Sequence, residues 1–167
     1  MLSKIECFSC RGLFDDIEGP VHRYMSSSQG CWAAFGKVLA REYSEPELLE
    51  IHRLSVDAYA VQHPGEPSPQ TIGSIGVHLI RLCLFHEYDL TPEHANDAML
   101  KVSKNKGSFV WLEPPGSLGP ITVGDVVKSN SVEEHKSAVR EWAKGAWEAW
   151  SPHHRQIRTW LSASGQD

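Results

Sequence analysis

The sequence lacks the features that mark several large classes of protein. It has no block of basic residues, and its 16 Lys and Arg stand against 21 Asp and Glu, for a net charge of −5. A nucleic acid is therefore not an expected partner. Four cysteines in 167 residues are too few for a disulfide framework. The Gly-rich phosphate loop, GxSxG and HExxH motifs are also absent, so no common catalytic motif indicates a reaction.

Long apolar segments are missing too. The first residues, MLSKIECFSC, contain no apolar run before a cleavage site, which argues against secretion and against oxidised cysteines. The longest apolar run, around Val77 to Phe85, is interrupted by His78 and Arg81 and is far shorter than the ~20 residues that cross a bilayer. We therefore expect a soluble cytoplasmic protein with reduced thiols and no membrane contact.

Most of the chain carries helix signals instead. Residues 1–27 have no helical period and are rich in turn residues, so we expect an irregular knuckle there that can include a short hairpin. From residue 28 onward, apolar residues recur at steps of three and four, which is typical of amphipathic helices. This predicts an all-α fold of five to seven helices. We expect one domain over residues 1–167, in which the knuckle packs on a helical body at 28–163 and a polar tail follows at 164–167.

Capping residues and prolines predict where these helices begin. A first helix should run from Ser28 to about Tyr43. A second should start at Ser44-Glu45-Pro46-Glu47 and end near His63-Pro64-Gly65. Further starts are predicted at Ser68-Pro69, Thr91-Pro92, Thr122, Ser131 and Ser151-Pro152, the last of these for an amphipathic piece that includes His153. Residues 107–121 contain Glu113-Pro114-Pro115 and cannot continue a helix, so they should form a connection packed on the body.

The first cluster of reactive side chains is Cys7-Phe8-Ser9-Cys10. Two thiolates separated by two residues can turn toward one ion, and zinc prefers four such ligands in a tetrahedron. His22 and Cys31 can complete the set with the spacing C-x2-C-x11-H-x8-C, and Cys31 is favoured because the first turn of a helix stabilises a thiolate. A pair of ordinary reduced cysteines and a redox dithiol are the alternatives. Cys83 is expected in the core.

The second cluster is His52, Asp57, His63 and His78. Leu49, His52, Val56, Tyr59 and His63 would share one inward stripe of the second helix. In that helix His52 and His63 would lie about 16 Å apart and could not bind one ion. If the second and third helices form an antiparallel hairpin, His52 and His78 would sit at nearly the same level and could meet.

Several roles are open to these residues. His52, His63 and His78 are alternative metal ligands, and His52, Asp57 and His78 are the candidate catalytic residues. Each histidine can equally be a neutral core residue bonded to a carbonyl or hydroxyl. Asp57 can act as a ligand or general base, or can pair with Arg53 four residues earlier on the helix surface.

Several segments together resemble a known family. They are HRYMSSSQGCWAAFGKVLAREY, HRLSVDAYAVQHPG, VHLIRLC, WLEPPGSLGPITVGDV and VREWAKGAWEAWSPHH. They are similar to an uncharacterised bacterial family catalogued only as a domain of unknown function, which brings no established activity. In members of that family a glycine follows the CxxC pair directly, whereas this chain has Arg11 there and Gly12 next. The resemblance implies a zinc site at Cys7, Cys10, His22 and Cys31.

Two functions follow from these residues. In the first, the zinc ion is structural and held by four protein ligands, and the protein is a binding or regulatory module for an unknown small molecule or protein. In the second, a metal with an open position activates water between the second and third helices, which would make the protein a small metal-dependent hydrolase. The oligomeric state is left open by the sequence.

Overall fold

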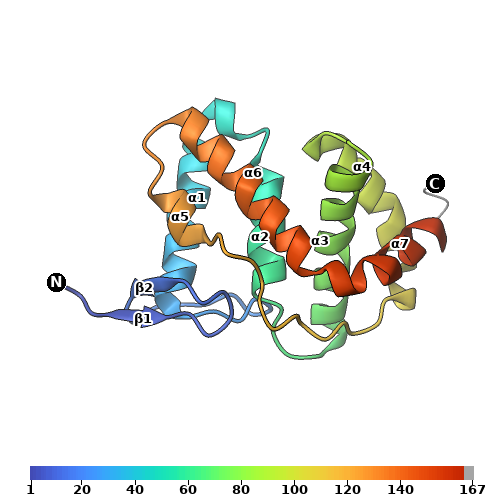
Figure 1. Cartoon of the computed structure of the whole chain (residues 1–167), viewed down its shortest axis with the longest axis horizontal. Coiled ribbons are helices and arrows are strands. Elements are labelled where there is room, and N and C mark those ends of the chain that lie inside the picture. The colour runs from blue at the N-terminus through green and yellow to red at the C-terminus, as the bar shows by residue number, and fades with distance from the viewer. Residues whose placement is uncertain (164–167) are drawn as a thin grey trace.

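The computed structural model describes residues 1–163, except for the side chains of residues 105 and 106. The predicted polar tail at 164–167 lies outside the described residues. Within this part of the chain the structure has seven α-helices and one small two-stranded sheet (Figure 1), so the predicted all-α fold is confirmed. The helices are α1 (Gln29–Ser44), α2 (His52–Gln62), α3 (Pro69–Glu87), α4 (Pro92–Val102), α5 (Val123–Val127), α6 (Val132–Ala149) and α7 (His154–Ala163). Three 3-10 turns join them, η1 (Pro46–Leu48), η2 (Ser103–Ser108) and η3 (Ser151–His153).

The helices begin where capping side chains satisfy their first free N–H groups. Ser28 accepts from the backbone N–H of Cys31, and Ser68 accepts from that of Thr71 in a full capping box. The same role is played by Thr91 for α4, Thr122 for α5 and Ser131 for α6. These five starts are therefore confirmed, and in each case the local sequence alone is sufficient to specify them.

The predicted start of the second helix at Ser44 is wrong. Ser44 is the last residue of α1, and its hydroxyl donates back to the Arg41 carbonyl. The chain then makes the 3-10 turn η1, and α2 begins only at His52. The tighter turn places Leu48 and Ile51 in the core while Leu49 points outward. Burial of these two aliphatic side chains thus outweighs the local capping signal.

Helix α2 is the centre of the body. It packs against α1, α3 and α6 (Figure 1), and it also contacts α4. Of the predicted stripe, Tyr59 and His63 are fully buried, but Leu49 is 51% exposed. The helix is buried on several sides, and its polar Ser55, Asp57 and Gln62 are as inaccessible as its apolar residues. A single amphipathic stripe therefore describes this helix poorly.

The short sheet is a hairpin at the N-terminal end of α1. Strands β1 (Lys4–Glu6) and β2 (Leu13–Asp15) pair antiparallel, with Ile5 opposite Phe14. The hairpin fits tightly against the helix at Gly30, where an added Cβ would lie 2.1 Å from the carbonyl oxygen of Asp15. Gly30 is therefore needed for this close approach.

The connection before α5 packs on the body, as predicted. Gln62 donates to the carbonyl oxygens of Leu118 (2.9 Å) and Ile121 (2.7 Å), and accepts from Trp142 Nε1 at 2.8 Å. One buried amide at the end of α2 thus fixes both the connection and α6. None of the helices in residues 1–163 is both long enough and apolar enough to span a membrane.

Candidate metal centre

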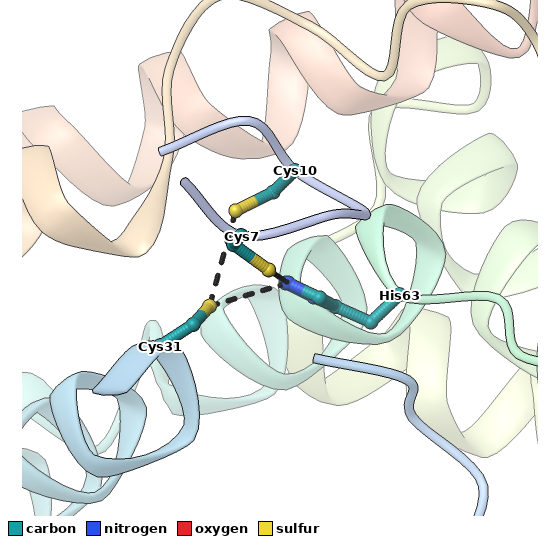
Figure 2. Close-up of side chains that lie close together, drawn as sticks. All are labelled: Cys7, Cys10, Cys31 and His63. Carbon is teal, nitrogen blue, oxygen red and sulfur yellow. Dashed lines mark hydrogen bonds between the residues drawn. The ribbon is translucent and has the colours of Figure 1, made fainter. Parts of the chain in front are cut away.

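Four donor side chains from three parts of the chain meet at the base of α1 and α2. Figure 2 shows Cys7 and Cys10 on the turn after β1, Cys31 in the first turn of α1 and His63 directly after α2. Their ligand atoms all lie within 4.8 Å of one another. All four residues are buried, between 0 and 4% exposed. Such a cluster of three thiols and one imidazole is a possible metal site.

A tight turn positions Cys7 and Cys10. The backbone N–H of Cys7 donates to the Gly12 carbonyl (2.8 Å), and that of Arg11 donates to the Cys7 carbonyl (2.9 Å). Arg11 adopts a positive φ of 65°, a conformation that favours glycine. This explains why a glycine after the CxxC pair suits the turn.

Helix α1 supplies the third sulfur. Cys31 follows the Ser28 cap, which accepts from its backbone N–H at 3.2 Å. Its Sγ lies 3.8 Å from Cys10 Sγ and 3.3 Å from His63 Nε2. The Tyr59 hydroxyl, 3.5 Å away, also contacts this sulfur.

The ring of His63 is oriented so that one nitrogen is free for an ion. Its Nδ1 lies 2.7 Å from the Tyr59 carbonyl oxygen, and because a carbonyl only accepts, Nδ1 carries the hydrogen. The Nε2 lone pair then faces the sulfurs of Cys31 and Cys7, the latter at 3.8 Å. Metal-binding histidines commonly have their second nitrogen fixed in this way.

Electrostatics favour a bound cation at this cluster. Hydrogen bonds from Cys10 and Cys31 hold the pKa of Cys7 well below its usual value. Hydrogen bonds to Cys10 and Cys7, together with burial, raise the pKa of Cys31. For Cys10, the bond with Cys31 lowers the pKa, but the bond with Cys7, burial and the charge of Cys7 raise it to about 12. One thiolate in the cluster thus disfavours ionisation of the other two thiols, because the negative charges would repel one another. A bound cation would remove that repulsion.

His22, the preferred histidine ligand from the sequence, is not part of this cluster. Its Nδ1 accepts from the backbone N–H of Tyr24 at 3.0 Å, and its ring lies against Trp32 with centroids 5.4 Å apart. The structure brings His63 to the three cysteines instead, which gives the spacing C-x2-C-x20-C-x31-H. His63 was one of the alternative ligands, and it reaches the cysteines because α2 ends beside the start of α1.

His52 belongs to a different, buried polar network. Its Nδ1 donates to Glu42 (2.8 Å), and His135 Nε2 donates to the same carboxylate (2.9 Å). Ser55 also donates to Glu42, and the exposed Tyr43 hydroxyl contacts His52 Nε2 at 3.1 Å. Burial raises the pKa of Glu42, but the hydrogen bonds from His135, His52 and Ser55 lower it below its usual value. Sequence reasoning missed Glu42, because a glutamate in a helix usually faces solvent.

Asp57, rather than His52, lies opposite His78. His78 Nδ1 donates to the Asp57 carboxylate at 2.8 Å, and Arg81 donates to both of its oxygens. The expected surface pair of Asp57 with Arg53 does not form, because Asp57 is fully buried and Arg53 donates to Asn96 instead. The hairpin of α2 and α3 is present, but Asp57 lies about 7.5 Å further along α2 than His52 and is the residue at the level of His78.

Comparison with known proteins gives one match. The model of a protein family described as "Family of unknown function (DUF5946)" matches residues 5–151. This range contains all four donors of the cluster and every element from the second residue of β1 to α6. No curated protein and no solved structure matches the chain.

Proposed function

Since the chain belongs to the DUF5946 family, whose description assigns no activity, we propose a function from its metal centre. Cys7, Cys10, Cys31 and His63 hold one zinc ion that fixes the N-terminal knuckle to the helical body. The protein is then a zinc-stabilised binding or regulatory module. The observation that carries this proposal is the buried set of four donors within 4.8 Å.

The distances support zinc. With Zn–S bonds of ~2.3 Å and a Zn–N bond of ~2.05 Å, a tetrahedral ion has S···S distances of about 3.8 Å and S···N distances of about 3.5 Å. The Cys10–Cys31 sulfur distance is 3.8 Å, and two of the three sulfur–Nε2 distances, those of Cys31 and Cys7, are 3.3 and 3.8 Å. Three thiolates also favour zinc over magnesium or calcium, which prefer oxygen ligands.

The donor set supports a structural role for the ion. Zinc in a structural site has four protein ligands, whereas a hydrolytic zinc keeps one position open for water. Four buried donors are enough to fill such a tetrahedron, which supports a structural ion. The hydrolase alternative at His52, Asp57 and His78 lacks comparable support, because His52 and His78 donate to different buried carboxylates.

The knuckle needs such an ion for its stability. Each strand has only three residues, and apart from its cysteines the hairpin buries chiefly Phe14. A segment with so little apolar surface gains stability from a metal in the way that zinc fingers do, since metal binding and folding share one free energy.

Elemental analysis of the purified full chain tests the proposal. We expect one zinc per chain in the native protein, and loss of both zinc and thermal stability in Cys7→Ser/Cys10→Ser. Cys83→Ser is the matched control, because Cys83 lies in the core beside Glu87 and away from the cluster. Retention of zinc in the double variant would overturn the assignment.

A further inference from the structure

The zinc knuckle forms one wall of a surface groove. This groove, which we call the knuckle groove, lies between residues 10–17, the α1 segment 30–37 and the segment 119–128 that contains α5. Its volume is about 680 Å³, within the range of ligand-binding clefts. The part of its lining that α1 contributes includes the small residues Gly30, Ala33 and Ala34.

The residues that line the groove carry a net positive charge. Lys4, Arg11, Lys37 and Lys128 line it together with two carboxylates, those of Asp15 and Asp125. Four positive charges against two negative ones give the lining residues a charge of +2, and Glu6, which pairs with Arg11, reduces this to +1, in a chain whose net charge is −5. An anionic ligand is therefore attracted to this part of the surface.

Two of these cations are available to a ligand. In the described part of the chain Lys37 has no ion pair within 4 Å, and its charge acts on Asp15 only from a longer distance. Lys128 contacts Asp125 at 3.9 Å, and its side chain is 79% exposed. Lys4 and Arg11 are paired with Asp15 and Glu6, but these pairs are exposed and weak enough to exchange partners.

Apolar side chains are exposed among these charges. Leu13 on the hairpin is 67% exposed, and Val127 on α5 is 39% exposed. Both line the groove, on two different walls. A ligand that matches both features has an aliphatic group flanked by carboxylates.

We propose that the knuckle groove binds a short acidic segment of a partner protein, with at least two carboxylates flanking an aliphatic side chain. The carboxylates pair with Lys37 and Lys128, and the aliphatic side chain contacts Leu13 and Val127. This proposal rests on the proposed function, because Cys10, Arg11 and Gly12 belong to the turn that zinc holds. A single-stranded nucleic acid fits less well, since it needs exposed aromatic rings for base stacking and the groove's Phe14 is buried.

The test uses the zinc-loaded full chain and a random heptapeptide library displayed on phage. We expect the selected peptides to be enriched in Asp and Glu beside Leu, Ile or Val. The most enriched sequence is then synthesised with a fluorophore, and its affinity is measured by anisotropy. In Lys37→Glu/Lys128→Glu it should bind at least about tenfold more weakly, because attraction becomes repulsion.

The matched control is Lys101→Glu/Lys144→Glu, which changes the net charge equally at two exposed lysines on α4 and α6. It should bind the peptide within about twofold of the native chain. Selection of no acidic peptide, equal losses in both double variants, or tighter binding of a fluorescent ten-nucleotide oligo-dT would overturn the proposal. Zinc is measured in every preparation. If the protein contains zinc but binds no peptide, only the peptide-binding proposal is overturned. If the protein contains no zinc, the proposed zinc site is overturned, and the peptide-binding proposal with it.

Discussion

His63 Nε2 lies 3.3 Å from Cys31 Sγ, although 32 residues separate the two in the chain. The contact joins the end of α2 to the start of α1. It makes His63, and not the nearer His22, the nitrogen donor of the proposed zinc site.

His63→Ala should weaken zinc binding by more than about 100-fold. Loss of an outer partner of a metal ligand commonly costs 10–100-fold, and loss of the ligand itself should cost more. Competition with a chromophoric chelator measures the affinity. His22→Ala removes a histidine that contacts Trp32 and Tyr24 instead, so its affinity should stay close to that of the native chain. An equal loss in both variants would contradict the assignment.

Removal of zinc with a chelator should loosen the knuckle first. We expect a fall of about 10 °C or more in the melting temperature. Loss of the metal removes several kcal/mol of stability, and each kcal/mol lowers the melting temperature of a chain of this size by about 2–4 °C. Hydrogen exchange should speed up most at the amides of residues 4–15. Amides in α3, whose middle is buried among α2, α4 and α7, should change least. Uniform acceleration throughout would argue against a local clamp.

Arg11→Gly should stabilise the zinc-loaded protein by about 0.5–1 kcal/mol, because residue 11 has a φ of 65° and glycine adopts this conformation without a penalty. The exposed ion pair with Glu6 contributes little. Arg11→Ala is the matched control, since it loses the same ion pair but keeps a Cβ. Urea unfolding should give a larger free energy of unfolding for Arg11→Gly than for Arg11→Ala. The reverse order would contradict the role given to this turn.

Glu42→Gln should destabilise the protein at pH 7 by about 1–3 kcal/mol, since a neutral amide cannot accept from His52, His135 and Ser55 together. The pKa of Glu42 is lower in the folded chain than its usual 4.5. The folded state therefore binds fewer protons there, and this stabilisation is present above about pH 4.5 and is lost as the pH falls through the folded pKa.

Denaturant unfolding of the native chain and of Glu42→Gln at several pH values measures the difference between their free energies of unfolding. Loss of metal in acid is common to the native chain and the variant, so it cancels in the comparison. A difference that grows as the pH falls below 4.5 would contradict the inferred direction of the shift.

Asp57→Asn should destabilise the fold by about 3–5 kcal/mol, because it leaves the buried guanidinium of Arg81 without its counter-charge. Arg53→Ala should cost less than about 1 kcal/mol, since the hydrogen bond that Arg53 donates to Asn96 is only partly buried. Calorimetry compares the two. An Asp57→Asn protein that folds normally yet loses a bound ligand would favour a catalytic role for Asp57 instead.

The sequence was sufficient for most of the fold, because five of the helix starts depend on local caps such as Ser28 and Ser131. The sequence was also sufficient to recognise the family, and the match of the family model to residues 5–151 confirms that resemblance. The sequence failed at Ser44, where the local cap competes with burial of Leu48 and Ile51 in the tertiary structure. Three of the four donors were predicted together, but the fourth depends on how α1 and α2 pack. Glu42 and Arg81 were missed because burial of a charged residue is decided by the neighbours that it meets only in the folded chain.

Because the fourth donor, His63, follows α2, the proposed zinc site cannot be completed until that helix has been synthesised. Cys7 and Cys10 leave the ribosome early and can hold an ion only loosely between them. The proposed zinc site would be complete only once α1 has formed, residue 63 has emerged and α2 has folded back along α1. If zinc binds as proposed, its capture is a late step, and a nascent chain whose first two helices have not yet docked would still exchange the ion with the solution.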